Sequence, residues 1–230
     1  MSSSSAQILE HVVLIKVKDG TDPSRVNAMI DGLNALVSLD SVLHAATGPV
    51  LHTPRSSSSP LTFTVMFHGR YRTKDDLDAF ADHPDHIRVV EELNAPIRED
   101  IMTADWITDR VPEGAVALPP GSAVRVSLLK LKEGSGDEAK GEVLSAVAEG
   151  IRDGLGRVEH ATWGENFSPL SKDFSIASLT VFKNMEEMEA ATAVAAAAAA
   201  PLQEKVGKHV DSVISVDYVV PHPQPVSLSL

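Results

Sequence analysis

The sequence predicts an α+β fold made of two tandem units, each with the element order β-α-β-β-α-β. Residues 11–20 (HVVLIKVKDG) return at 125–134 as RVSLLKLKEG. Two later landmarks return at a similar offset: HAATG at 44–48 becomes HATWG at 160–164, and DWI at 105–107 becomes DYV at 217–219. This offset is too long for a solenoid repeat of roughly 20 to 50 residues. It matches the length of a small domain.

The repeat and the composition between its copies set the domain boundaries. We place the first unit at residues 8–110, a linker at 111–121, the second unit at 122–221 and a tail at 222–230. The linker, VPEGAVALPPG, has the proline and glycine content of a connecting segment.

The elements of the first unit follow from its periodicity and its turn residues. Residues 11–18 alternate as a strand that is apolar on both faces. Asp22 and Thr73 are side chains that cap helix N-termini, and Pro23 suits a first helical position. The predicted strands are residues 11–18, 42–51, 61–71 and 100–108, and the predicted helices are 23–37, 74–82 and a segment after His83-Pro84.

The second unit repeats this order with changed side chains. Asn184 takes the capping role of Thr73, and the alanine-rich residues 190–200 favour a helix because alanine is the best helix former. The predicted strands are residues 123–132, 157–163, 174–182 and 213–220, and the predicted helices are 137–152 and the segment after Asn184.

Composition excludes several classes of protein. The formal net charge of −12 does not fit a nucleic-acid-binding surface. Without cysteine there is no disulfide and no thiolate metal site. No apolar run approaches the roughly 20 residues of a membrane span, and the N-terminus lacks signal-peptide features. The C-terminal SLSL is either a polar tail or a variant of the Ser-Lys-Leu peroxisomal signal, so we expect a cytoplasmic or peroxisomal protein.

Three segments together resemble a known family. Residues 10–19 (EHVVLIKVKD) resemble the opening strand of the stress-responsive dimeric α/β-barrel family, and residues 74–80 (KDDLDAF) and 83–86 (HPDH) resemble its second helix and His-Pro-x-His corner. The likeness is to plant members with two copies in tandem. The resemblance implies two ferredoxin-like units whose sheets pack face to face in one barrel with the helices outside, here as an intrachain pseudo-dimer.

A sheet with helices on one face leaves the other face bare, and that face needs a partner. In the implied barrel we expect one face of the first strand to point inward, with the residues His11, Val13, Ile15 and Val17. A homodimer of whole chains remains open as a further level of assembly. We expect no nucleic-acid or membrane partner.

The resemblance also implies candidate catalytic residues. A polyketide cyclase of this family closes a ring with a histidine–tyrosine set, and His11, His83 and His86 match its histidine positions, with His86 as the base. Phe80 stands at the tyrosine position and Val65 at that of a third-strand histidine, so part of the set is missing. In the second unit Arg125 replaces His11, and VAAA at 194–197 replaces the corner.

Two functions follow from this comparison. We favour a non-catalytic stress-response protein that stabilises other proteins or binds a small hydrophobic ligand. The alternative is a polyketide cyclase or lyase that uses His86 and His11. A haem protein or monooxygenase is an analogy at the level of the fold alone.

His83 and His86 also have plainer interpretations. They can hydrogen-bond the backbone groups that a His-Pro helix break sets free. As a metal pair they would lack a third ligand. No cofactor is required, although the resemblance implies a Mg²⁺ site made by backbone carbonyls near Val37, Asp40 and Leu43.

Overall fold

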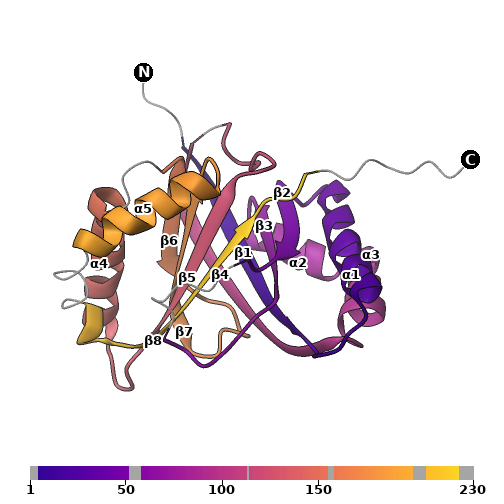
Figure 1. The fold of residues 1–230 in the computed structure, drawn as a ribbon, viewed down its shortest axis with the longest axis horizontal. Helices are drawn as coiled ribbons and strands as arrows, with labels where there is room; N and C mark the ends of the chain where they lie inside the picture. The colour runs from indigo at the N-terminus through magenta and orange to yellow at the C-terminus, as the bar shows by residue number, and fades with distance from the viewer. Residues whose placement is uncertain (1–4, 52–57, 113, 155–157, 199–205, 223–230) are drawn as a thin grey trace, which may run out of the picture.

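The protein consists of two units with the same sheet topology (Figure 1). This computed structural model describes residues 5–51, 58–112, 114–154, 158–198 and 206–222. Within them lie two four-stranded antiparallel sheets with strand orders β2-β3-β1-β4 and β6-β7-β5-β8. The matching orders confirm the predicted α+β fold of two ferredoxin-like units. The SLSL tail and Ala199–Ala200 lie outside the described residues.

The elements follow the predicted order in both units. The first unit contains β1 (Ser5–Val17), α1 (Pro23–Ala35), the 3₁₀ turn η1 (Leu36–Ser38), β2 (His44–Pro49), β3 (Val65–Tyr71), α2 (Lys74–Ala81), α3 (Pro84–Arg88), the π-helical turn η2 (Val89–Asn94) and β4 (Arg98–Pro112). The second contains β5 (Ala123–Leu131), α4 (Asp137–Gly154), β6 (His160–Glu165), β7 (Phe174–Phe182), α5 (Met185–Ala198) and β8 (Val210–Val219).

The predicted helix caps are formed. The side chain of Asp22 accepts a hydrogen bond from the Ser24 N–H at 2.8 Å. Thr73 caps α2 through the Asp76 N–H at 3.1 Å, and Asn184 caps α5 at 2.9 Å. Each cap satisfies a backbone donor that the first helical turn leaves free.

The two sheets pack face to face, with the helices on the outside. Figure 1 shows α1, α2 and α3 on one side of the paired sheets and α4 and α5 on the other. The core between the sheets draws buried side chains from both units, including Val12, Leu14, Met66, Val126, Leu128 and Leu179. The pairing of the two units therefore takes place within one chain.

The inner and outer faces of β1 are the reverse of what we expected. His11, Val13 and Ile15 point toward the helices, and Val12 and Leu14 point toward the second sheet. Val17 belongs to the same helix-facing layer as Ile15. Because both faces of this strand are apolar, alternation alone could not decide which face meets a helix and which meets a sheet.

The edges of the two sheets are joined by backbone hydrogen bonds. Phe167, just after β6, donates its N–H to the Asp105 carbonyl on β4 at 2.9 Å, and Leu51, just after β2, donates to the Asp217 carbonyl on β8 at 2.9 Å. These two contacts occupy equivalent positions in the repeat. They cover strand edges that would otherwise be free to pair with another chain.

The linker covers one end of the barrel. Leu118 is buried in the core between the sheets, and the Ala115 and Val116 carbonyls accept hydrogen bonds from Arg70, each at 2.9 Å.

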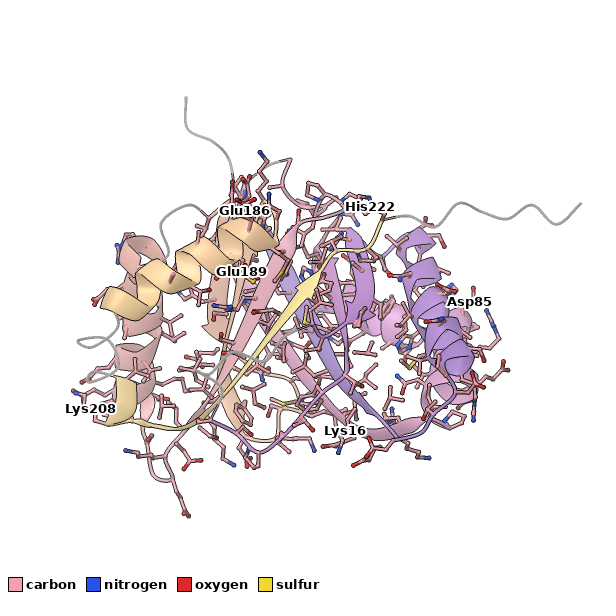
Figure 2. All side chains as sticks on the ribbon, in the orientation of Figure 1. Lys16, Asp85, Glu186, Glu189, Lys208 and His222 are labelled. Atoms are coloured by element: carbon pink, nitrogen blue, oxygen red, sulfur yellow. The ribbon has the colours of Figure 1, made fainter. Side chains whose placement is uncertain are left out.

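Charged side chains such as Asp85, Glu186 and Lys208 lie on the outside of the molecule (Figure 2). No described helix is long and apolar enough to cross a membrane.

Candidate functional site

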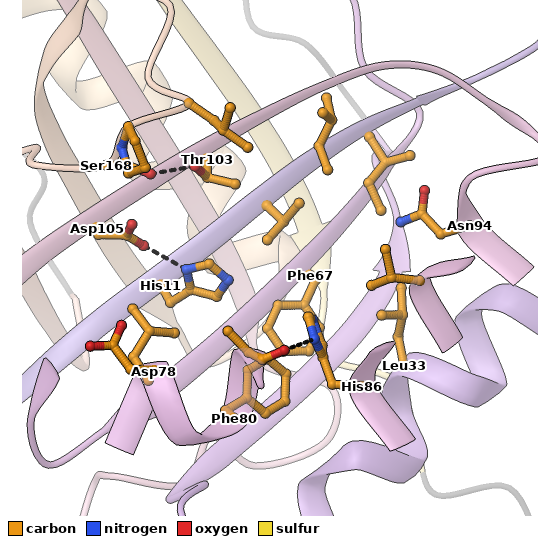
Figure 3. A pocket seen from close by; sticks show the side chains of 18 of the residues that line it. His11, Leu33, Phe67, Asp78, Phe80, His86, Asn94, Thr103, Asp105 and Ser168 are labelled. Atoms are coloured by element: carbon orange, nitrogen blue, oxygen red, sulfur yellow. Dashed lines mark hydrogen bonds and ion pairs between the residues drawn. The ribbon is translucent and has the colours of Figure 1, made fainter. Parts of the chain in front are cut away.

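A cavity of about 390 Å³ lies between the first sheet and the helices that cover it (Figure 3). Its volume falls within the roughly 300 to 1,000 Å³ of small-molecule sites. Most of the wall is apolar, including Val13, Ile15, Leu33, Phe67, Leu77 and Ile101. The cavity thus suits a small molecule that is mainly hydrocarbon.

His11 faces this cavity and pairs with Asp105. The two are register partners on β1 and β4, and His11 Nδ1 lies 2.5 Å from Asp105 Oδ1. The backbone N–H and C=O of Asp105 bond to Asn166 and Phe167, away from β1. The pair is therefore of the non-hydrogen-bonded antiparallel kind, in which facing side chains approach most closely. The carboxylate orients the imidazole and leaves its Nε2 edge toward the cavity (Figure 3).

His86 lies across the cavity from the His11–Asp105 pair, beside Phe80 (Figure 3). Its Nδ1–H donates to the Ala81 carbonyl at 2.9 Å, and its ring centroid lies 4.5 Å from that of Phe80. Burial lowers the pKa of His86, against the opposing effect of the Ala81 hydrogen bond. The neutral ring therefore presents an unprotonated Nε2, which can accept a hydrogen bond or a proton.

Tyr71 supplies a phenol beside His11 that the family comparison did not anticipate. Its ring lies 6.0 Å from His11 and 5.3 Å from Phe80, and its hydroxyl is buried with no hydrogen-bond partner among the described residues. Gly69, the register partner of His11, leaves room for it, since a Cβ there would lie 2.9 Å from the hydroxyl. Burial raises the pKa of Tyr71, so the phenol stays neutral.

The other predicted site residues lie elsewhere. His83 is the N-cap of α3, where its Nδ1 accepts from the Asp85 N–H at 3.2 Å, and it does not line the cavity. Val65 is buried in the layer between the first sheet and its helices. The imidazoles of His83 and His86 thus both bond backbone groups around the His-Pro break, as their structural interpretation requires.

In the described part of the chain, no group of three or more His, Asp or Glu side chains is arranged so that it could hold a metal ion. The carbonyl site near Val37, Asp40 and Leu43 stays a prediction. Val37 is an exposed residue of η1, and the Leu43 N–H bonds to the Arg70 carbonyl.

The second unit carries an ion pair where the first has His11 and Asp105. Arg125 and Asp217 are register partners, joined by two hydrogen bonds of 2.7 Å. Arg125 also donates to Thr192 on α5 at 2.8 Å. This guanidinium bridges sheet and helix, so the position equivalent to His11 offers no imidazole in the second unit.

The repeated sequence and the two-sheet architecture identify the family. Residues 9–108 and residues 123–220 each match the family described as "Stress responsive A/B Barrel Domain". The chain belongs to this family.

Two plant members of the stress-responsive A/B barrel family are similar over nearly the whole chain. One stress-response A/B barrel domain-containing protein of Arabidopsis thaliana is 48% identical over 96% of this chain and 82% of its own length. A second Arabidopsis protein of the same description is 43% identical over 94% of this chain and 98% of its own length.

Solved structures share the two-unit fold at low sequence identity. An anthrone oxidase-like protein has a TM-score of 0.62 at 11% identity, covering 100% of this chain and 98% of its own. A putative monooxygenase from Fusobacterium nucleatum has a TM-score of 0.60 at 11% identity, covering 96% and 94%. At such identities the likeness is one of fold alone.

A second polar group of this family member lies between the sheets, away from the cavity. Glu10 is fully buried, and its carboxylate lies 2.6 Å from His68 Nε2 and 3.0 Å from Arg70 Nη2. From the second unit, Thr162 donates to Glu10 at 3.1 Å, and His160 Nε2 lies 3.0 Å from Arg70 Nη2. This cluster joins the units through a charge that is paired and hydrogen-bonded.

Burial and neighbouring charges shift the pKa values of the ionisable side chains in and beside this cluster. Burial alone would raise the pKa of Glu10, but the charges and hydrogen bonds of Arg70 and His68 hold it well below its usual range. Burial lowers the pKa of His160 to about 4 and that of His44 to about 2, with Arg70 and His68 adding to the effect. Both histidines are therefore neutral at pH 7.

Proposed function

We propose that this stress-response barrel protein binds a small, largely apolar molecule in the cavity of its first unit. The observation that carries the proposal is the meeting of two imidazoles, His11 and His86, in a cavity of about 390 Å³ with apolar walls. Apolar burial would supply the affinity, and a few placed polar groups would fix the orientation. The expected ligand therefore has a hydrocarbon body and one hydroxyl or carbonyl oxygen.

The unprotonated Nε2 of His86 accepts a hydrogen bond from a ligand hydroxyl. Because Asp105 takes the Nδ1–H of His11, the Nε2 of His11 donates to the ligand oxygen when that ring is doubly protonated, and the oxygen then lies between the two imidazoles. In the second unit Arg125 is committed to Asp217 and Thr192. We therefore expect one ligand per chain rather than two.

A cavity-filling substitution tests this function. Straight-chain primary alcohols from butanol to dodecanol serve as probes, and isothermal titration calorimetry measures their affinity and stoichiometry. Val13→Phe places a ring in the cavity and should abolish binding, while Val37→Phe, at an exposed position outside the cavity, should leave it unchanged. Wild-type protein that binds no alcohol, or equal binding by both variants, would overturn the proposal.

A second candidate function is proton-transfer catalysis of the polyketide cyclase or lyase type. It is favoured by the 2.5 Å His11–Asp105 contact and by the free Nε2 of the neutral His86. In this scheme His86 takes a proton from carbon next to a carbonyl, and a doubly protonated His11, whose Nδ1–H is bonded to Asp105, donates its Nε2–H to the carbonyl oxygen as that oxygen gains charge.

Turnover of a polyketide-like thioester tests the catalytic scheme. His86→Ala should lower the rate about 10²- to 10⁴-fold, the usual contribution of a positioned general base, while the chain stays folded. His209→Ala, at a histidine on the second unit, is the matched control. If the purified wild-type protein consumes no such thioester, this candidate is rejected.

The C-terminal residues bear on the location of the protein in the cell. We expect the protein in the cytoplasm or, if Ser227–Leu230 acts as a signal, in peroxisomes. A fluorescent fusion at the N-terminus, with and without Leu230, separates these locations. Light scattering on the purified chain distinguishes a monomer from a homodimer.

A further inference from the structure

One wall of the first unit's cavity comes from the second unit. The segment between β6 and β7, residues 166–173, crosses to the first sheet, and its residues Ser168, Pro169 and Leu170 line the cavity with residues of the first unit. Leu170 is 52% exposed, which places it at the rim rather than at the floor. The composite cavity is thus completed by the copy that has Arg125 in place of His11.

The segment 166–173 is bound to β4 much as an added strand would be. The Thr103 N–H donates to the Leu170 carbonyl at 3.1 Å, and the Phe167 N–H donates to the Asp105 carbonyl at 2.9 Å. Asn166 Oδ1 accepts from the Asp105 N–H at 2.8 Å. Both backbone groups of Asp105, the residue that orients His11, are therefore held by the second unit.

Side-chain contacts also hold the segment in place. The Thr103 and Ser168 hydroxyls are hydrogen-bonded to each other. Lys74 Nζ on α2 lies 4.0 Å from the centre of the Phe167 ring, and Lys172 pairs with Asp100 at 2.8 Å. The segment is therefore tied both to β4 and to α2, the two elements on either side of the cavity.

We propose that the segment 166–173 is the specificity element of the cavity and that Leu170 sets the length of hydrocarbon it accepts. This inference rests on the proposed binding function and adds the residue that selects among ligands. In the first unit the reciprocal segment is the one that follows β2, and its Leu51 bonds to β8, but there Arg125 stands in place of His11. Each unit thus places a segment on the other, but only the segment of the second unit lines a cavity that contains His11 and His86.

Substitutions at Leu170 test this role with the same alcohol series. Leu170→Ala removes hydrocarbon contact at the rim and should weaken the long alcohols, by about fourfold for each methylene group that loses its contact, while short alcohols bind as before. Leu170→Trp narrows the rim and should move the preferred chain length toward shorter alcohols. Leu51→Ala, at an equally exposed leucine of the reciprocal segment, should leave the whole profile unchanged.

The outcomes separate this inference from the proposed function. Thermal unfolding of each variant, monitored by circular dichroism, confirms that the compared chains are folded. A wild-type chain that binds the series, together with Leu170 variants that keep its chain-length profile, overturns the specificity role alone. A wild-type chain that binds no alcohol overturns the binding function and the specificity role together.

Discussion

Glu10 is a side chain whose loss should cost this protein much of its stability. It is fully buried and balances the equally buried Arg70. Glu10→Ala leaves that guanidinium without its counter-charge, and removing one partner of a buried pair typically costs about 3–5 kcal/mol. We expect the free energy of unfolding, measured by urea titration, to fall by an amount of this order.

The exposed pair Lys16–Glu99 is the control for this prediction. Its 2.7 Å separation makes it as close as the contacts of Glu10, but both side chains reach water. Exposed pairs contribute little because solvent screens them and the side chains lose freedom on pairing. Glu99→Ala should therefore leave the unfolding curve almost unchanged, and an effect as large as that of Glu10→Ala would contradict the role assigned to burial.

Residue identities were easier to predict than residue partners. The family comparison selected His11 and His86, which do reach one cavity. It offered no partner for His11, although Asp105 and Asp217 stood in the sequence as a repeated landmark after each unit's last helical segment. Pairing across strands depends on register, and register between strands more than 90 positions apart is not visible in local sequence.

At the scale of elements, the two repeated glycines of β2 and β6 differ in how tightly they are packed. A Cβ at Gly164 would lie 3.2 Å from Trp106, whereas at Gly48 it would lie 3.5 Å from Tyr218, an ordinary contact. Gly164→Ala should destabilise the protein by about 1–3 kcal/mol through overpacking. Gly48→Ala should be near neutral or slightly stabilising, because it restricts the unfolded chain.

Paired measurements of the two glycine variants decide this point. Urea unfolding of Gly164→Ala and Gly48→Ala, compared with the wild type, should give a clear loss in the first case alone. Equal losses would mean that both glycines serve the backbone of the strand, and that packing against the aromatic side chains is not the cause.

The order of the strands and the main helices was predictable because these elements have local signals. Alternation indicated strands such as β1 and β3, and the caps Thr73 and Asn184 indicated where α2 and α5 begin. The π-helical turn η2 had no such signal, since it continues the helical pattern of α3. The direction in which His11 points was predicted wrongly, because β1 is apolar on both faces and only its neighbours decide which face is inner.

At the scale of the whole molecule, the two units have divided their roles. Their sheets build one core between them, and each sends a segment onto the last strand of the other. The first unit keeps the imidazoles, and the second supplies a wall and replaces the imidazole with Arg125. The sequence repeat predicted the shared framework, but this division depends on contacts between segments distant in the chain, which carry no local signal.

The buried histidines between the sheets should make the stability of the whole barrel depend on pH. In the unfolded chain a histidine titrates near 6.5, while burial lowers the pKa of His160 to about 4 and that of His44 to about 2. Between these values the unfolded chain binds protons that the folded chain does not. The contribution of these histidines to the free energy of unfolding is therefore present in full well above pH 6.5. It is lost as the pH falls, by at most about 1.4 kcal/mol per pH unit for each histidine.

Urea unfolding at a series of pH values between about 7 and 5 measures this dependence, and in that range Glu10 is ionised in both states. His160→Gln removes one titrating group and keeps an acceptor for Arg70, so its free energy of unfolding should change less steeply with pH than that of the wild type. Equal slopes would show that His160 takes up its proton in the folded barrel. In that case the pairing of the two sheets would tolerate a second positive charge beside Arg70, which the closed polar cluster around Glu10 argues against.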